Sequence, residues 1–384
     1  MQDSAQCSVG RGSRRNYLSF LGRCLYAGSF AVSAKAIAQQ HTATPESLGP
    51  RNYFGHDFAR YGYDQYLKQI VRRAKQLDFG ARGAALPFDG YEHLADFRMA
   101  FDLRERHVVR PGSVRRESIV RESSHRIDRI RFELGNGFPV IALFGYPSGV
   151  PRRSVLLLHG IATTPERSMG IGDPDYMQHV GKRLVSAGFA VACPFFPHAG
   201  NLSSVSAMSA LLAASGIAFH ETVVSIALAC LDLLAEYDAW RPRTERPGCY
   251  GVSMGALLGL HASILDERVG SLVCSGYLRD DRLLLNTDLM DEMVGRGEIY
   301  PTLHSRSAWN YGLVETIALY CPRPLFIEVG KHDPMSSEAL GRTDSLGRIR
   351  RLYRSREKGN RLTVSIFDGG HEAHGRVAIP WLGS

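Results

Sequence analysis

The chain has 384 residues, of which 44% are hydrophobic and 22% are charged, as in an ordinary soluble globular protein. A chain of this length can bury a large core, so its fold needs no disulfide or metal framework. The net charge of +8 comes mostly from arginine, yet no stretch combines basic residues with stacking aromatics in a nucleic-acid-binding pattern. We therefore predict a basic, solvated surface and no nucleic-acid partner.

The N-terminal segment has the layout of an export signal. Arg14 and Arg15 precede an aromatic residue and a leucine, and a weakly apolar stretch follows that ends in small residues at 36–38. Paired arginines in this setting resemble a twin-arginine signal, which is an address read by a receptor. We predict a signal peptide over residues 1–38 and a periplasmic or secreted protein. The alternative is a cytoplasmic protein whose N-terminus is disordered or forms an amphipathic helix.

A membrane span is not predicted from the hydropathy of the chain. Arg23 interrupts the apolar run of the signal, and no other segment approaches the roughly 18 consecutive apolar residues that a span needs. We therefore expect no stable membrane insertion.

The cysteines do not follow a metal-binding pattern. Two of the seven lie in the predicted signal, and the others are odd in number and lack the spacing of metal ligands. Most of them fall in apolar runs, which favours buried free thiols, with one disulfide pair as the alternative. These cysteines are Cys193, Cys230, Cys249, Cys274 and Cys321.

Amphipathic helices are predicted before the first strand. Apolar residues recur at helical spacing over 64–77 and again over 91–103. We assign residues 39–125 to an N-terminal extension and helical cap, and residues 126–384 to the main domain.

The main domain alternates strands with helices. It opens with a predicted hairpin, in which strands 127–134 and 139–146 flank a Gly-Asn-Gly turn. A hairpin followed by this alternation predicts an α/β fold with a doubly wound, mostly parallel sheet. Further strands are predicted at 154–158, 189–193, the residues that end at 250, 270–274, 324–329 and 362–367, and helices at 174–187, 217–237, 254–264 and 336–354.

A G-x-S-x-G pattern lies at 251–255, between a predicted strand and a predicted helix. Its glycines allow a tight turn and a close approach of the helix to the strand. The turn places Ser253 at the helix N-terminus, where backbone N–H groups and the helix dipole favour negative charge. A serine hydroxyl is a poor nucleophile by itself, so catalysis also requires a base and an acid that orients the base. The alternative is a structural serine.

Candidates for both partners occur downstream, each just after a predicted strand. Asp333 follows strand 324–329, and His371 follows strand 362–367. Ligands of open α/β sheets bind at the carboxyl ends of the strands. We therefore expect Ser253, Asp333 and His371 to converge at one edge, in the chain order of a Ser…Asp…His triad.

Neighbouring residues compete for these roles. His374 is the alternative base, but we expect it in the following helix. Glu328 is the alternative acid, but it precedes the loop and we expect it to point into the sheet layer. We expect Glu372 to cap the final helix, with a role in steadying the loop as the alternative.

The turn after strand 154–158 supplies a candidate oxyanion hole. We predict that the backbone N–H of Ile161 or Ala162, together with that of Met254, binds the oxygen that becomes negative during acyl transfer. We expect His159 to shape this turn by hydrogen bonding rather than to act as a base.

The motifs together resemble the α/β-hydrolase superfamily, in the branch of dienelactone hydrolases and acetyl-xylan-type esterases. The resemblance covers residues from about 150 to 384 and says little about residues 39–125. It implies an α/β-hydrolase catalytic domain with Ser253 as nucleophile, His371 as base and Asp333 as acid. The matching stretches are LLLHG at 156–160, GVSMG at 251–255, CPRPLFIEVGKHDP at 321–334 and FDGGHEAHGRVAIPWL at 367–382.

The sequence departs from the family pattern at two positions. Met254 follows the serine, where glucuronoyl esterases carry arginine. Dienelactone hydrolases use cysteine as nucleophile, so Ser253 indicates ordinary ester hydrolysis.

We predict a serine hydrolase that cleaves a carboxylic ester through an acyl-enzyme. No metal or organic cofactor is implied, the expected partner is a small-molecule ester, and no oligomeric state is indicated. The alternatives are an acyltransferase or a peptidase on the same fold, or a non-catalytic binding protein. A peptidase of this fold would usually carry a propeller domain, for which the N-terminal region is too short and too helical.

A long excursion at 276–320 interrupts the alternation of strands and helices. Its apolar residues either form a lid that lines an acyl pocket or belong to the core. They include Tyr277, residues 283–285, Met290, Trp309 and Tyr311.

Overall fold

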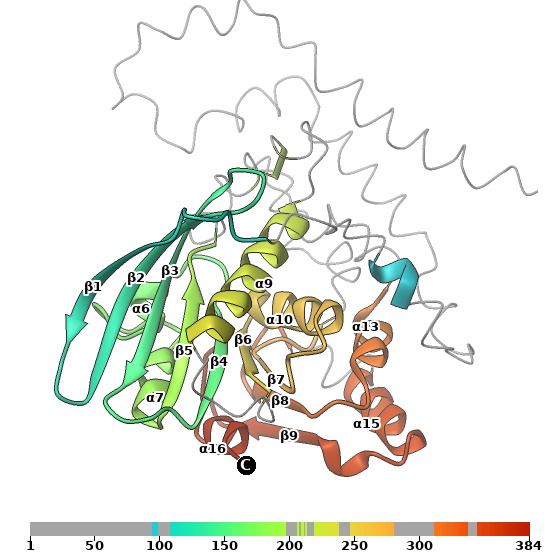
Figure 1. The fold of residues 1–384 in the computed structure, drawn as a ribbon. Helices are drawn as coiled ribbons and strands as arrows, with labels where there is room; N and C mark the ends of the chain where they lie inside the picture. The colour runs from blue at the N-terminus through green and yellow to red at the C-terminus, as the bar shows by residue number, and fades with distance from the viewer. Residues whose placement is uncertain are drawn as a thin grey trace, which may run out of the picture. The chain divides into compact units, whose positions relative to one another are not determined.

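A nine-stranded mixed sheet runs through the centre of the fold (Figure 1). In this computed structural model the described residues are 94–98, 108–196, 206, 209–210, 212, 219–237, 246–279, 311–336 and 344–384. The strands are β1 (Arg115–Arg121), β2 (His125–Glu133), β3 (Pro139–Pro147), β4 (Arg153–Leu158), β5 (Phe189–Pro194), β6 (Gly248–Val252), β7 (Ser271–Ser275), β8 (Leu325–Gly330) and β9 (Leu362–Phe367).

The sheet has an antiparallel part and a parallel part. Its strand order is β1-β2-β3-β5-β4-β6-β7-β8-β9. The pairs from β1 to β5 are antiparallel, whereas the pairs from β5 to β9 are parallel. The predicted fold class, an α/β fold with a doubly wound and mostly parallel sheet, is confirmed.

Helices cover both faces of the sheet. They are α6 (Pro165–Ser168), α7 (Val180–Ser186), α9 (Phe219–Tyr237), α10 (Met254–Leu265), α13 (Leu313–Tyr320), α15 (Ser345–Ser355) and α16 (Ala378–Leu382), with a 3-10 turn, η7, at Gly359–Arg361. The core of one face packs against α9, α10, α13 and α15, and the core of the other packs against α7 and α16.

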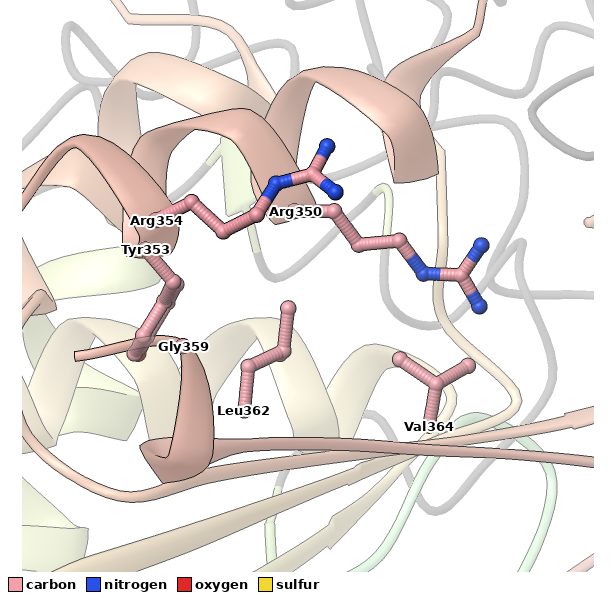
Figure 2. Close-up of a pocket in the computed structure, with 6 residues that line it drawn as sticks. All are labelled: Arg350, Tyr353, Arg354, Gly359, Leu362 and Val364. Atoms are coloured by element: carbon pink, nitrogen blue, oxygen red, sulfur yellow. The ribbon is translucent and has the colours of Figure 1, made fainter. Parts of the chain in front are cut away.

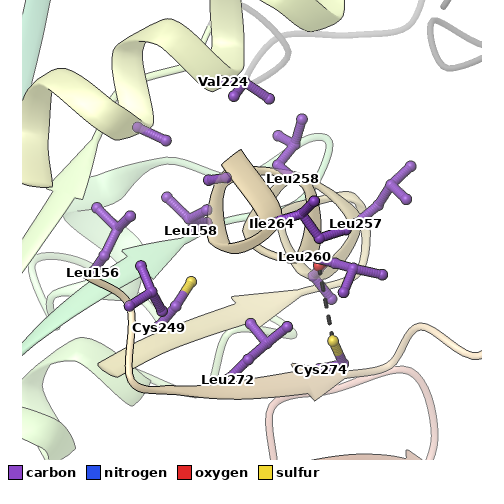
Figure 3. Packing of buried hydrophobic residues seen from close by; sticks show 14 of the residues in the cluster. Leu156, Leu158, Val224, Cys249, Leu257, Leu258, Leu260, Ile264, Leu272 and Cys274 are labelled. Atoms are coloured by element: carbon purple, nitrogen blue, oxygen red, sulfur yellow. Dashed lines mark hydrogen bonds between the residues drawn. The ribbon is translucent and has the colours of Figure 1, made fainter. Parts of the chain in front are cut away.

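Strand β4 shows why both faces are apolar. Leu156 and Leu158 belong to one core cluster and Val155 and Leu157 to the other, because successive side chains of a strand point to opposite faces. Figure 3 shows the first of these clusters, in which Leu158 lies beside α10 and Leu156 lies beside Cys249. A strand that is buried on both faces has a continuous run of apolar residues, and the sequence of β4 shows such a run.

The predicted hairpin is confirmed, but the sheet begins earlier than predicted. β2 and β3 pair in register from His125 opposite Pro147 to Glu133 opposite Pro139. β1 precedes them and pairs with β2, so the sheet starts at Arg115, within the stretch assigned to the N-terminal extension. Its sequence, RRESIVR, is too charged to show an apolar pattern, as is common for an edge strand.

One predicted helix is shorter than expected, and another is described only in part. The helix predicted over 174–187 begins only at Val180, because Gln178 and His179 both have positive φ angles, which an α-helix does not accommodate. Residues 176–179, directly before α7, form turns. Of the helix predicted over 336–354 the structure describes residues 336 and 344–354, and α15 covers Ser345–Ser355.

Several predictions lie wholly or partly outside the described residues. The signal peptide and the helix over 64–77 are among them and stay predictions. Of the helix over 91–103 the structure describes residues 94–98, which are helical. Of the excursion at 276–320 it describes the two ends, where Tyr277 and Tyr311 are buried in the core and α13 forms a helix that the sequence did not predict.

The described cysteines are all free and buried, as predicted. No helix among the described residues is both long and apolar enough to cross a membrane.

Candidate active site

Ser253 lies at the turn between β6 and α10. β6 ends at Val252 and α10 begins at Met254, so Ser253 is the single residue between them. Its backbone angles, φ 56° and ψ −127°, fall in a region that residues other than glycine rarely adopt. The N–H of Ser253 donates to the carbonyl of Ser275 at 2.8 Å, which ties the turn to β7. A strained serine between a strand and a helix is typical of a nucleophile in α/β-hydrolases.

The glycines of the G-x-S-x-G pattern make this turn sterically possible. A Cβ atom on Gly255 would lie 2.1 Å from the carbonyl oxygen of Leu158, and one on Gly251 would lie 2.3 Å from the carbonyl oxygen of Gly255. Both distances are far shorter than a van der Waals contact. Any side chain at either position would therefore push α10 away from the sheet.

Asp333 and His371 meet in the loops that follow β8 and β9. His371 Nδ1 lies 3.0 Å from Asp333 Oδ2. Asp333 is fully buried and also accepts hydrogen bonds from the Met335 N–H at 2.8 Å and the Ser336 hydroxyl at 3.2 Å. Because a carboxylate only accepts, Nδ1 of His371 carries the hydrogen and Nε2 is the nitrogen that can take up a proton.

Backbone contacts hold these two loops together. The N–H of Lys331 donates to the carbonyl of Phe367 at 2.8 Å, and the N–H of His332 donates to that of Gly369 at 2.9 Å. A Cβ atom on Gly276, directly after β7, would lie 3.3 Å from Cε1 of His371. The imidazole therefore packs against the end of β7.

The turn after β4 lies against Ser253. A Cβ atom on Gly160 would lie 2.8 Å from the Cβ of Ser253 and 2.6 Å from the hydroxyl oxygen of Tyr176. The ring of Tyr176 has its centroid 5.7 Å from that of His371. Gly160 thus lies next to both Ser253 and Tyr176, and Tyr176 lies next to His371.

The hydroxyl of Ser253 is not hydrogen-bonded to the Asp333–His371 pair. Among the hydrogen bonds of the described residues, none joins Ser253 Oγ to His371. The acid and the base are therefore in contact with each other, whereas no hydrogen bond joins the serine to the base.

Glu328, the alternative acid, contacts other groups. Its Oε1 accepts from the Tyr250 hydroxyl and the Ser275 hydroxyl, each at 2.9 Å, and both of its carboxylate oxygens accept from the Gly375 N–H at 3.0 and 2.9 Å. Burial, together with the negative charge of Glu328, raises the pKa of Tyr250 well above its usual value. Glu328 points into the sheet layer, as expected, and fastens the loop that follows His371.

His159 is fully buried and hydrogen-bonded on both ring nitrogens. The N–H of Phe196 donates to Nε2 at 3.3 Å, so the hydrogen of the neutral ring is on Nδ1, which donates to the Gly160 carbonyl at 2.8 Å. Burial lowers the pKa of His159 to about 4. These contacts support the expected structural role, in which His159 shapes the turn that contains Gly160.

Two expectations about the last loop are wrong. His374 does not lie in a helix, because α16 begins only at Ala378, and its ring stacks on Phe367 with centroids 4.4 Å apart. Glu372 does not cap α16, whose N-cap is Val377; its Oε2 accepts instead from the Gln178 amide at 3.1 Å. The loop is fastened by tertiary contacts, which the local sequence does not show.

The predicted oxyanion donors occupy the two turns beside Ser253. Ile161 and Ala162 follow Gly160, and Met254 follows Ser253 as the first residue of α10. Ala162 is exposed and has a φ of 59°, in the left-handed region. None of the hydrogen bonds between described residues uses the N–H of these three residues as donor.

Tyr176 is a site residue that the sequence patterns missed. Residues 174–178 were expected to be helical, but they form a turn beside Ser253 and His371. The signal that could have revealed this turn is the run Gly-Asp-Pro-Asp at 172–175, whose residue types favour turns.

A separate pocket of about 260 Å³ lies between α15 and β9 (Figure 2). Arg350 and Arg354 come from the helix, and Leu362 and Val364 from the strand. None of the predicted site residues lines it, so this pocket is distinct from the candidate active site.

Comparisons with known proteins agree with the fold. A candidate acetyl xylan esterase from Bacteroides fragilis is 16% identical, with a TM-score of 0.54 over 74% of this chain and 77% of that chain. A methylesterase is 13% identical, with a TM-score of 0.53 over 77% of this chain and 62% of that chain. No protein-family model matches the sequence, and a comparison with curated proteins finds no match.

The chain has the α/β-hydrolase fold, as the sequence motifs predicted. Its structural neighbours are esterases of that fold and include acetyl xylan esterases.

Proposed function

We propose that the chain is a serine-dependent carboxylic ester hydrolase with Ser253 as nucleophile, His371 as base and Asp333 as the acid that orients the base. The observation that carries the proposal is a strained serine at the same edge of the sheet as a buried aspartate that contacts a histidine. Ser253 has a φ of 56° at the turn after β6, and the Asp333–His371 contact of 3.0 Å lies at the ends of β8 and β9, on the same edge of the sheet.

The proposed reaction proceeds through an acyl-enzyme. Nε2 of His371 takes the proton of Ser253 as the serine oxygen attacks the ester carbonyl, and the alcohol then leaves with that proton. Water repeats the sequence on the acyl-enzyme and releases the acid. Asp333 keeps the hydrogen on Nδ1 of His371 and stabilises the imidazolium that forms.

The negative oxygen of the tetrahedral intermediate needs hydrogen-bond donors beside Ser253. We assign this role to the N–H of Met254 with that of Ile161 or Ala162. The close packing of Gly160 on Ser253 supports the assignment, since a Cβ on Gly160 would lie 2.8 Å from Ser253 Cβ. Loss of one such donor typically costs roughly 10²–10³-fold in rate.

The choice of an ester as substrate has support from the neighbours. The two similar structures carry the names of an acetyl xylan esterase and a methylesterase, both of which act on carboxylic esters. A panel of aryl esters of increasing acyl length, followed by acetylated sugars and methyl esters, would identify the preferred substrate.

The direct test is covalent labelling of Ser253. A fluorophosphonate probe should form one adduct on Ser253, and Ser253→Ala should abolish both labelling and the hydrolysis of p-nitrophenyl acetate while the circular dichroism spectrum stays unchanged. Ser263→Ala, which removes a buried hydroxyl from the same helix α10, is the matched control and should retain activity. Absence of an adduct on Ser253 in the folded protein would exclude the proposal.

A further inference from the structure

The turn at 175–178 is held between the loop that follows β4 and the loop that carries His371. On one side, the Thr163 hydroxyl donates to Asp175 and the Tyr176 hydroxyl donates to the carbonyl of Ile161 at 2.7 Å. On the other side, the N–H of Ala373 donates to the carbonyl of Tyr176 at 2.8 Å. One residue, Tyr176, therefore contacts both loops, with its side chain on the first and its backbone on the second.

The hydroxyl of Tyr176 fixes the orientation of one peptide unit. The carbonyl of Ile161, which it binds, belongs to the same planar unit as the N–H of Ala162. In a trans peptide the carbonyl and the N–H point in opposite directions. A hydrogen bond that holds the Ile161 carbonyl therefore also sets the direction of the Ala162 N–H, one of the candidate oxyanion donors.

This peptide unit needs an external restraint. Ala162 has a φ of 59°, a left-handed conformation that residues with a Cβ atom seldom adopt. It is also exposed, so burial does not hold it in place. The Tyr176 hydroxyl binds the residue before Ala162, and Asp175 binds the residue after it. These two contacts supply that restraint.

The same tyrosine lies beside the proposed nucleophile and base. Its hydroxyl oxygen lies 2.6 Å from the Cβ position of Gly160, which itself lies 2.8 Å from Ser253 Cβ. Its ring lies 5.7 Å from that of His371, at an interplanar angle of 35°.

We infer that Tyr176 is a positioning residue, whose hydroxyl fixes the orientation of the Ile161–Ala162 peptide unit, and with it that of the Ala162 N–H, and whose backbone holds the His371 loop. The inference rests on the proposed ester hydrolysis. Tyr176 acts through Ala162 and Ala373 and not by contact with the reacting atoms.

Tyr176→Phe tests the inference, since it keeps the ring and the backbone bond to Ala373 and removes only the hydroxyl. We expect kcat for p-nitrophenyl acetate to fall by roughly 10–100-fold with little change in KM, because the lost contact acts on the transition state. The inhibition constant of a trifluoromethyl ketone, which forms a tetrahedral adduct on serine, should rise by the same factor. A general loss of stability would not lower kcat and raise the inhibition constant of the ketone by the same factor.

Tyr320→Phe is the matched control. The hydroxyl of Tyr320 also donates to a backbone carbonyl, that of Pro324 at 2.9 Å, from a buried position. This variant should lose similar stability and keep its kcat and its affinity for the ketone.

The outcomes separate this inference from the proposed function. An unlabelled, inactive wild-type chain overturns ester hydrolysis itself. A wild-type chain that labels and turns over, with Tyr176→Phe equal to Tyr320→Phe in kcat and ketone affinity, overturns the inference alone. If Tyr176→Phe does not fold, Thr163→Val takes its place, because it removes the other side-chain hydrogen bond that holds the turn around Ala162. An unchanged kcat in that variant also overturns the inference.

Discussion

Two Asp–His pairs lie in the loops after β8 and β9, and their environments differ. Asp333 is fully buried and binds His371, whose side chain is 24% exposed. Asp368 and His332 pair at 2.9 Å in the same loops, but their side chains are 88% and 65% exposed. An exposed pair contributes little orientation, since water competes for both groups. Because Asp333 is buried and Asp368 is exposed, Asp333 is the carboxylate that can hold the imidazole of its partner in one tautomer.

Asp333→Asn should lower kcat on the order of 10³–10⁴-fold, because an amide cannot hold the hydrogen on Nδ1 of His371 in the same way. Stopped-flow or steady-state hydrolysis of p-nitrophenyl acetate measures this. Asp368→Asn is the matched control and should change kcat less than about twofold, as expected for an exposed pair. Equal effects in the two variants would contradict the assignment of Asp333.

At the level of elements, one buried carboxylate joins three strands and a loop. Glu328 is on β8, and it accepts hydrogen bonds from Tyr250 on β6, from Ser275 on β7 and from the Gly375 N–H. Buried polar groups are costly unless their hydrogen bonds are satisfied. The network therefore specifies one placement of the loop after His371 relative to the sheet.

Glu328→Gln should destabilise the fold by about 1–3 kcal/mol, because the new amide group places N–H donors against the donors of its partners. Urea unfolding followed by fluorescence gives this free energy. The control is Glu372→Gln, whose carboxylate accepts from Gln178 at an exposed position and should change stability by less than about 0.5 kcal/mol. A neutral effect of Glu328→Gln would show that the network adds no stability.

At the level of the whole molecule, buried histidines make stability depend on pH. Burial lowers the pKa of His159 and of His220 to about 4, and it lowers the pKa of His261 as well. His220 on α9 and His261 on α10 have ring centroids 5.0 Å apart, so these two helices meet at neutral imidazoles.

The unfolded chain protonates His159 and His220 near pH 6.5, whereas the folded chain does so only near pH 4. Stability is therefore full above pH 6.5 and falls as the pH drops from 6.5 toward 4, by on the order of 3 kcal/mol for each of the two. His220→Leu should lose less stability than the wild type between pH 7 and pH 4.5 in urea unfolding. His332→Gln, at an exposed histidine, should follow the wild type. A pH-independent difference between His220→Leu and the wild type would contradict the prediction.

The sequence by itself determined the elements whose signals are local. Apolar runs predicted β4, β5 and β8 because strands buried on both faces carry apolar side chains throughout. The G-x-S-x-G pattern predicted the turn at Ser253, because only glycine fits at Gly251 and Gly255. The positions of Asp333 and His371 after strands predicted that they meet, since the carboxyl ends of parallel strands share one edge.

Only the tertiary structure decided what depends on distant residues. Glu328 binds Tyr250 on β6, Ser275 on β7 and the Gly375 N–H, partners that no local pattern around Glu328 indicates. β1 is stabilised by its pairing with β2 and not by its own charged sequence. The helix predicted from 174 begins at Val180, since Tyr176 is held by Ile161 and Ala373. These contacts join residues that are far apart in the chain, so no local pattern contains them.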